Sequence, residues 1–295
     1  YGPVPLLPDD GLDYTADYDD LEIQRNSYDE CVEYIESEMC LAAKDLPLAR
    51  AINQVARPTR GAALAARARA LVYSASPINN PRTGDPDKFS DLVDYEGRCL
   101  MSQEYNEYKW ARAAAAARDV MELPGENNGR RYELYHKKAT NIAEPGYPAT
   151  IAPYQDKDFS TKTWNEGGYS DIDPYESYRA VFNGSLAMYQ NPELIFSRGR
   201  NQGANSIAEM VKLQMPKTLG GGSNAYGMTQ KMCDAYYMAN GDEFSREHFK
   251  EEYPYGTRFV TKEEVEAGTY PQLKEGVYKE YANREPRFYA SVSFN

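Results

Sequence analysis

The sequence predicts a mainly α-helical fold, in which tetratricopeptide-like helix pairs are followed by a loop-rich half with a few short strands. Two observations predict it. Segments with helical spacing of apolar residues occupy much of residues 27–123, whereas proline, glycine, asparagine and tyrosine dominate residues 144–175 without a sustained period. We expect residues 1–135 to form a helical scaffold. We expect residues 136–295 to form a loop-rich, ligand-facing region that packs on it as one unit.

The first predicted helix spans residues 27–47. Ser27 and Glu30 have the spacing of a capping box, in which each side chain accepts a hydrogen bond from the other residue's backbone N–H, and Pro47 ends the helix. The apolar side chains recur at alternating spacings of three and four, which is the period of one helix face. They are Val32, Ile35, Met39, Ala42 and Leu46.

The second predicted helix begins near Thr59, after Pro58, and ends before Pro77. Alanines crowd residues 61–73, and small side chains allow a neighbouring helix to approach closely, although alanine is also the best helix former. A short loop joins the two helices, so we expect them to pack antiparallel. The side chains expected to meet are Ile35, Met39 and Ala42 on one helix and Leu64, Ala68 and Leu71 on the other.

The third predicted helix covers residues 108–123 and is closed by Pro124 and Gly125. Its aromatic start and small-residue middle resemble the first helix of a tetratricopeptide unit, although no strict repeat of about 34 residues fits the three segments. Trp110 lies within this periodic segment, so we expect it in the core.

Shorter elements are predicted in the second half. A helix should open at Asp173 before a proline, a strand should cover residues 192–197, and a helix should span residues 228–238. Residues 287–294 have the composition of a strand. The glycine triplet at residues 220–222 requires a flexible or positive-φ turn, and it lacks the lysine of a phosphate-binding loop.

Composition and charge exclude several classes of function. The chain has 295 residues and a formal net charge of −12, so we expect neither nucleic acid nor an anionic membrane surface as a partner. No apolar run approaches the roughly 20 residues that span a bilayer, and no signal peptide is recognisable. The four cysteines show no disulfide or metal-binding pattern, and we expect buried thiols, with Cys31 and Cys40 too far apart on one helix to bond each other.

Little in the sequence predicts catalysis. The two histidines, His136 and His248, have no recognisable catalytic neighbours, and we expect both to be solvated. The 45 acidic residues leave a two-carboxylate glycosidase open on composition alone, but the expectation is a protein that is not an enzyme. Residues 17–20 and 85–91 could hold an incidental calcium ion, yet they lack the spacing of an EF-hand, and we expect no cofactor.

Aromatic side chains in loops are the first candidates for ligand binding. The chain has 26 tyrosines, whose flat faces and hydroxyls suit polar ligands, although most individual tyrosines fill a core. Trp164 lies in an aperiodic loop beside Asn165 and Glu166, with Tyr154 and Tyr169 on either side. An indole face can stack on the C–H face of a sugar while amides and carboxylates bind its hydroxyls. We therefore expect Trp164 to be an exposed platform for a ligand.

A second candidate patch lies in residues 198–202, which are dense in side chains that donate several hydrogen bonds. The candidate ligand-binding residues here are Arg200, Asn201 and Gln202, with Tyr226 nearby in the sequence. The alternative is a loop that packs on itself or on a partner protein.

Several of these segments together resemble the SusD/RagB family, surface lipoproteins that lie over TonB-dependent transporters in certain Gram-negative bacteria. No single segment decides the resemblance, but their shared order across nearly the whole chain makes it fairly specific. The similar segments are Gly2–Leu6, Ser27–Pro47, Arg57–Asn79, Asn191–Phe196, Met232–Asp242 and Asn283–Phe288.

The resemblance has two departures. Family members begin with a lipoprotein signal and a lipidated cysteine and continue well past the Pro-Arg-Phe element at residues 286–288, so we expect this chain to be truncated at both ends. Asn240 stands where the family commonly has aspartate in an Asp-Gly turn, which is a conservative change. The motif residues are expected to be structural, with Asp234 on a helix and with Arg284 and Arg287 anchoring a strand to it.

The resemblance implies capture rather than chemistry. It implies a protein that binds oligosaccharides on the extracellular face of the outer membrane and delivers them to a SusC-like TonB-dependent transporter, with a lipid anchor not present in this chain as its only membrane attachment. Two alternatives stay open: an oligopeptide-binding RagB-like protein and a tetratricopeptide-type scaffold for protein interactions. The tyrosine-rich loops argue against a bare scaffold.

Overall fold

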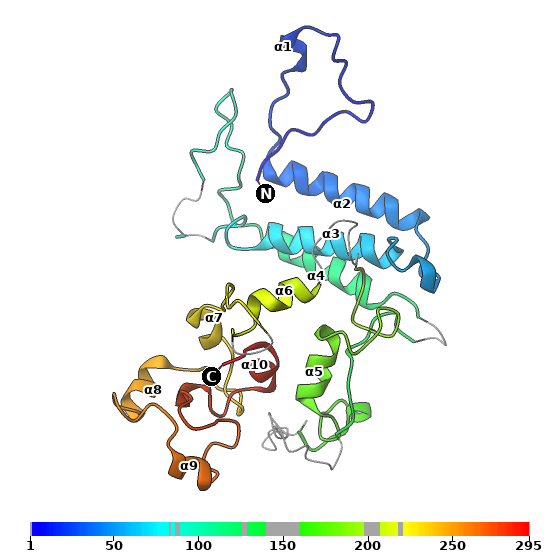
Figure 1. Cartoon of the computed structure of the whole chain (residues 1–295). Helices are drawn as coiled ribbons and strands as arrows, with labels where there is room; N and C mark the ends of the chain where they lie inside the picture. Colours follow the sequence, from blue (N-terminus) through cyan, green and yellow to red (C-terminus); the bar gives the residue numbers. More distant parts are fainter. Residues whose placement is uncertain are drawn as a thin grey trace. The chain divides into compact units, whose positions relative to one another are not determined.

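The computed structural model describes residues 2–82, 84–85, 89–125, 129–139, 160–197, 207–217 and 221–294, with the backbone alone for residues 207–210. The chain divides into two compact units (Figure 1). The helical unit comprises Tyr1–Glu133 and Pro192–Gly199, and the loop-rich unit comprises Leu134–Asn191 and Arg200–Asn295. The predicted fold class is confirmed, because helices dominate and the β-structure of the described residues is confined to isolated bridges. No described helix combines the length and the apolarity that a bilayer crossing requires.

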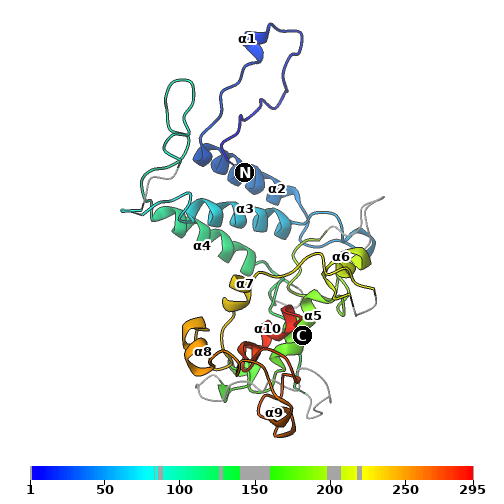
Figure 2. The same ribbon diagram turned by 60° about the vertical axis from the view of Figure 1, so that its left-hand side comes forward.

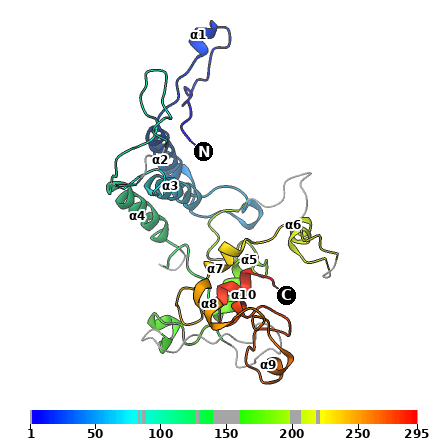
Figure 3. The same cartoon turned by 90° about the vertical axis from the view of Figure 1, so that its left-hand side faces the viewer.

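The core of the helical unit consists of three helices that lie side by side in Figures 1 and 3, α2 (Tyr28–Asp45), α3 (Arg60–Ala75) and α4 (Tyr108–Met121). The predicted capping box starts α2: Ser27 Oγ accepts from the Glu30 N–H at 3.2 Å, and Glu30 Oε2 accepts from the Ser27 N–H at 2.6 Å. The Arg60 side chain at the start of α3 donates to the Ala43 carbonyl near the end of α2 at 2.9 Å. The two helices are therefore antiparallel, as predicted. The short elements of this unit are α1 (Tyr18–Leu21) and the 3-10 turn η1 (Ile52–Gln54).

The contact between α2 and α3 involves partly different side chains from those predicted. Leu71 is buried in it and Ala68 packs against it, as expected, whereas Ile35 is 41% exposed and Val32 takes the central position on α2. Periodicity identifies the apolar face of a helix, but it does not determine which residue of that face lies at the centre of the contact. The buried cluster consists of Val32, Leu71, Ala75, Ala113 and Ala116.

Trp110 was predicted to lie in the core but is 41% exposed. The buried stripe of α4 recurs at helical spacing from Lys109 to Val120, and Trp110 lies one position, or about 100°, around the helix from it. Lys109 takes the interior position, where its ammonium donates to Asp29 Oδ1 at 2.6 Å and to the Asn79 carbonyl at 3.2 Å.

An ion-pair network connects all three helices. Glu36 of α2 binds Arg67 of α3, with Nη2 and Oε1 3.0 Å apart, and also binds Arg112 of α4. Arg67 Nη1 in turn lies 2.6 Å from Asp119 Oδ2 of α4. Burial by itself would raise the pKa of Glu36, but the hydrogen bonds from Arg112 and Arg67 hold that pKa below its ordinary value.

A long arm, residues 81–105, connects α3 to α4 and is closed at its base by Asn80. This side chain is 1% exposed. Its Nδ2 donates to the Asn106 carbonyl at 3.0 Å, and its Oδ1 accepts from the Asn106 N–H at 2.7 Å. The two ends of the arm are thus joined immediately before α4.

The loop-rich unit contains short helices separated by irregular segments. α5 begins after Asp173 as predicted, and the Asp173 side chain accepts from the Glu176 N–H at 2.9 Å. The helix predicted over residues 228–238 is confirmed only over its middle, and Gly221 has the positive φ expected in the glycine triplet. The elements are α5 (Pro174–Phe182), α6 (Ile207–Gln214), α7 (Gln230–Asp234), α8 (Arg246–Glu252), α9 (Lys262–Glu266), α10 (Pro286–Ser291), and the 3-10 turns η4 (Trp164–Glu166) and η5 (Lys279–Tyr281).

Both predicted strands are wrong. Residues 192–197 are a turn followed by an irregular segment, and residues 287–294 form most of α10 and its exit. Pro286 begins α10, where its missing N–H costs nothing, and Phe288 and Val292 are buried at helical spacing. A short apolar run is consistent with either a strand or a buried helix, and packing decides. Here α10 packs beside α5 (Figure 2).

Arg284 organises the core of the loop-rich unit. It is 1% exposed, and its guanidinium lies 4.4 Å from the ring centroid of Phe244 and 4.6 Å from that of Phe288. Burial lowers the pKa of Arg284. Its guanidinium donates to three backbone carbonyls, those of Cys233 at 2.5 Å, Tyr236 at 2.7 Å and Glu280 at 3.1 Å.

The two arginines predicted to be anchors therefore differ. Arg284 connects the start of α10 to α7 and to the segment that follows α7. Its predicted role as an anchor is therefore confirmed, but the element that it anchors is the helix α10 and not a strand. The Arg287 side chain is 53% exposed and pairs with Glu285, its near neighbour in sequence.

The cysteines are all free thiols. Cys31 and Cys233 are buried, as predicted, whereas Cys40 and Cys99 are only half-buried.

Candidate functional site

The loop-rich unit contains a cleft of about 580 Å³, which we call the C-terminal cleft. Its lining residues lie between Met238 and Asn283 and come from the turn after α7, from α8, and from η5. The volume falls within the range of small-ligand sites.

Aromatic rings form part of the cleft lining. The His248 N–H donates to Ser245 Oγ at 3.2 Å, which caps α8. Helical spacing then places Phe249 and Tyr253 one turn apart, with their ring centroids separated by 5.1 Å. The Tyr270 hydroxyl lies 3.2 Å from that of Tyr253. Burial, and then the bond to Tyr270, raise the pKa of Tyr253, so the Tyr253 hydroxyl stays protonated.

Lys279 and Glu280 are the buried charges of the cleft, with 6% and 3% of their side chains exposed. Lys279 Nζ lies 2.6 Å from Glu264 Oε1 and also over two tyrosine rings of the cleft. Glu280 Oε2 accepts from Arg246 Nη1 at 3.0 Å, although burial raises the pKa of Glu280. Both charges are therefore matched within the protein.

Three exposed carboxylates, those of Asp242, Glu243 and Glu252, line the cleft together with these buried groups. Asp242 Oδ2 accepts from the Asn240 amide at 2.6 Å. Glu252 Oε2 lies 3.9 Å from His248 Nε2. Glu243 has neither an ion pair nor a hydrogen bond within the described part of the chain. The cleft thus offers hydrogen-bond acceptors to a ligand.

Trp164, the predicted ligand platform, lies in the 3-10 turn η4 and not in an irregular loop. Glu166 Oε2 accepts from the Thr163 N–H at 2.9 Å and Oγ1 at 2.8 Å, and Asp171 Oδ1 accepts from the Trp164 N–H at 2.7 Å. The half-buried indole stacks on His136, with 4.7 Å between ring centroids and 22° between planes. An imidazole therefore covers one face of this indole.

Half of the predicted ligand-binding residues lie in the ranges that the structure describes. Asn165 is exposed beside Trp164, Tyr169 is half-buried, and Tyr226 is 64% exposed. The two histidines are exposed, as predicted. The predicted residues that lie outside the described ranges are Tyr154, Arg200, Asn201 and Gln202.

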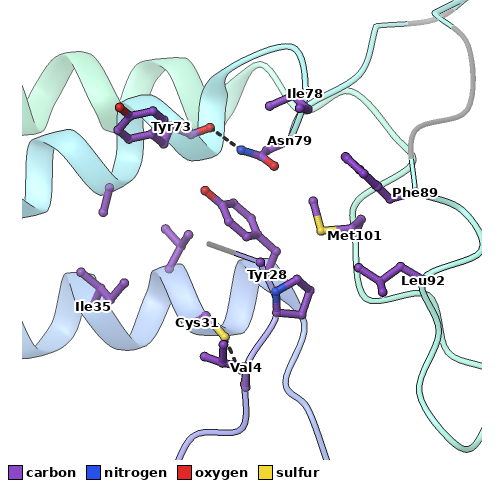
Figure 4. A pocket seen from close by; sticks show the side chains of 14 residues that line it. Val4, Tyr28, Cys31, Ile35, Tyr73, Ile78, Asn79, Phe89, Leu92 and Met101 are labelled. Atoms are coloured by element: carbon purple, nitrogen blue, oxygen red, sulfur yellow. Dashed lines mark hydrogen bonds between the residues drawn. The ribbon is translucent and has the colours of Figure 1, made fainter. Parts of the chain in front are cut away.

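The helical unit contains a pocket of about 820 Å³ with a different character (Figure 4). Two of its polar groups are already bonded: Asn79 Nδ2 donates to the Tyr73 carbonyl at 2.9 Å, and Cys31 Sγ donates to the Val4 carbonyl at 3.5 Å. Tyr28 and Tyr73 line it as well. Such a pocket favours an apolar ligand over a polyhydroxylated one, because buried hydroxyls need partners. Its apolar lining includes Val4, Ile35, Phe89, Leu92 and Met101.

The described ranges contain no group of three or more His, Cys, Asp or Glu side chains that could hold a metal ion. Residues 86–88 of the predicted calcium-binding segment lie outside those ranges.

Residues 192–295 match the sequence model of the SusD family. The solved structure of BT4246 is 24% identical, with a TM-score of 0.60 over 98% of this chain and 45% of that one. A selenomethionine form of BT4246 gives 22% identity and a TM-score of 0.56 over the same shares. The SusD-like protein BF3747 from Bacteroides fragilis NCTC 9343 gives 20% and 0.52 over 98% of this chain and 38% of that one. No curated protein matches the chain.

This chain spans less than half of the length of the solved structures that it matches. At these identities the likeness establishes the fold, and the matched segment establishes the family of residues 192–295.

The C-terminal cleft was missed by sequence reasoning. Asn240, Asp242 and Asn283 were assigned to structural motifs, yet all three line it. A weak signal existed, because acidic and aromatic residues alternate between Asp242 and Tyr255. The pattern did not show that residues some 30 positions further on complete the lining.

Proposed function

Because residues 192–295 belong to the SusD family on a SusD-like fold, we propose that this protein captures glycans on the extracellular face of the outer membrane and delivers them to a SusC-like, TonB-dependent transporter. The observation that carries the proposal is the C-terminal cleft, which lies wholly within the family segment. A lipid anchor is its proposed membrane attachment.

The chemistry of the cleft suits a sugar. A pyranose ring needs a flat apolar surface for its C–H face. The half-buried rings of Tyr253 and Tyr270 offer such a surface where the Lys279 ammonium does not cover them. The sugar hydroxyls need acceptors and donors, and the carboxylates of Asp242 and Glu252 and the amide of Asn283 line the same cleft. The pocket of the helical unit also offers aromatic and apolar faces, but no carboxylate is among the described residues that line it.

Binding without hydrolysis fits the carboxylates of the cleft. A glycosidase needs one carboxylic acid that protonates the glycosidic oxygen and a second carboxylate near it. The cleft carboxyl with a raised pKa is Glu280, but only 3% of its side chain is exposed and it is held by Arg246. It cannot reach a glycosidic oxygen in this position.

The Trp164 platform is a second part of the proposal. Trp164 presents an indole beside the exposed Asn165 amide, within the same unit as the cleft. We assign ligand contacts to both, with Tyr169 and Tyr226. The sequence alone supports the same role for Tyr154, Arg200, Asn201 and Gln202.

The test is calorimetric titration of the purified protein with a panel of oligosaccharides and peptides, with melting temperature measured alongside, since a bound ligand stabilises by mass action. Tyr270→Leu removes one of the two tyrosine rings of the cleft but keeps apolar packing against Leu273 and Val277. We expect it to weaken glycan binding about tenfold, or about 1.4 kcal/mol. The matched control is Tyr255→Leu, because Tyr255 is 94% exposed and does not line the cleft.

The outcomes separate the alternatives. If glycan binding is lost in Trp164→Ala and retained in Tyr270→Leu, the principal binding site is at Trp164 and not in the C-terminal cleft. A protein that binds peptides and no glycan would favour the oligopeptide-binding alternative.

A further inference from the structure

We propose that the C-terminal cleft selects glycans with a free, protonated amine, such as glucosamine oligomers, over the same glycans in N-acetylated, neutral or acidic form. The inference rests on the proposed function and names the class of glycan for the same site. It follows from the balance of charges that line the cleft.

The cations of the cleft are already occupied. Lys279 is the one lysine or arginine among the described residues that line the cleft, and its ammonium is held by Glu264 at 2.6 Å with 6% of the side chain exposed. Arg246, which binds the lining residue Glu280 at 3.0 Å, also pairs with Asp234 at 2.5 Å. Neither cation can offer its charge to an anionic sugar.

The exposed carboxylates, by contrast, have little compensation. Glu243 has no partner within the described part of the chain, and Asp242 is bonded by the neutral amide of Asn240. Glu252 Oε2 lies 3.9 Å from His248 Nε2. A positively charged His248 would neutralise only one of the three negative charges of these carboxylates. The mouth of the cleft therefore carries a surplus of negative charge.

An aminosugar satisfies both features of the site. Its ring can lie on the tyrosine faces, while its ammonium binds an exposed carboxylate through charge-assisted hydrogen bonds. Acetylation removes the charge and the ionic bond, and a uronic acid or sulfate reverses the sign of the interaction. The cleft should thus discriminate by the substituent on the ring more than by the ring itself.

The experiment titrates the protein with oligomers of glucosamine and of N-acetylglucosamine of equal length, at about pH 6, where the amines are protonated. We expect the amine oligomer to bind about five- to tenfold more tightly, with an advantage that shrinks as salt is added. Glu243→Gln should weaken amine binding about two- to fivefold and leave the acetylated oligomer unaffected. Glu252→Gln should weaken amine binding by more than it weakens binding of the acetylated oligomer, because the Glu252 carboxylate is also a partner for ring hydroxyls. Glu251→Gln, an exposed carboxylate of α8 outside the lining, is the control and should change neither.

Equal affinity for the two oligomers would overturn the inference. An equal loss in Glu251→Gln would also overturn it, because the attraction would then come from the overall charge of −12 and not from the cleft. If neutral glycans bind and amines gain nothing, the proposed function stands and this selectivity fails. If no glycan of any kind binds, both fail.

Discussion

Arg284→Met should strongly destabilise the loop-rich unit. The substitution keeps a long side chain between Phe244 and Phe288 but removes three hydrogen bonds from a charged donor to backbone carbonyls. Each such bond is worth about 1.5–3 kcal/mol. The guanidinium is itself disfavoured by burial, as its lowered pKa indicates, so the net loss should be smaller than the sum. We expect about 3–5 kcal/mol, because three carbonyls lose a charged donor while the cost of burying the guanidinium is relieved.

Urea unfolding followed by circular dichroism measures this loss, and Arg287→Met is the matched control. Arg287 lies three positions further on and its side chain is 53% exposed, so its replacement should cost within about 0.5 kcal/mol. The unfolding midpoint of the Arg284 variant should fall well below that of the control. Two variants of equal stability would show that Arg284 does not organise this core.

Four further predictions concern both units. Ala68→Leu should overpack the contact between α2 and α3 and cost about 1–3 kcal/mol in urea unfolding; an unchanged midpoint would refute that contact. The Glu36 pKa is lowered by folding, so its ionic contribution is complete above the ordinary value of about 4.3 and is lost as pH falls through the folded pKa. Glu36→Gln should therefore be less stable than the native protein at pH 7, and the difference should shrink in acid; a difference independent of pH would contradict this. Trp164→Ala should weaken glycan binding and cost at most about 1.5 kcal/mol through the lost His136 stack, whereas a loss of about 3–5 kcal/mol with affinity retained would make Trp164 a core residue. Incubation with a bound polysaccharide should release no reducing ends above a blank, and turnover abolished by one carboxylate substitution would show a hydrolase.

The long helices were predictable because their signals are local. The capping pair Ser27 and Glu30 and the proline after the helix fixed the limits of α2 to within about two residues. The faces were less predictable, since the side that is buried depends on the partner helix. Ile35 and Trp110 were misplaced for that reason.

The candidate site was predictable only in part, because its residues meet through the tertiary fold. Trp164 was identified from its loop neighbours, but its stacking partner His136 lies 28 positions earlier in the chain. The C-terminal cleft joins α8 to Tyr270 and Lys279, and no periodic pattern connects these segments. Residues that appeared structural in the sequence, such as Asn283, line the cleft for the same reason.

Asn80 has a consequence for protein engineering. Because its side chain binds both the N–H and the carbonyl of Asn106, the end of α3 is joined to the start of α4 without help from the exposed turn at residues 95–97 of the arm. Doubling the length of a flexible loop costs only about 0.6 kcal/mol. A reporter peptide or a small domain inserted at residues 95–97, away from the buried Leu100 and Met101, should therefore leave the three-helix core in register, which makes this turn a suitable attachment point for a fluorescent or affinity label.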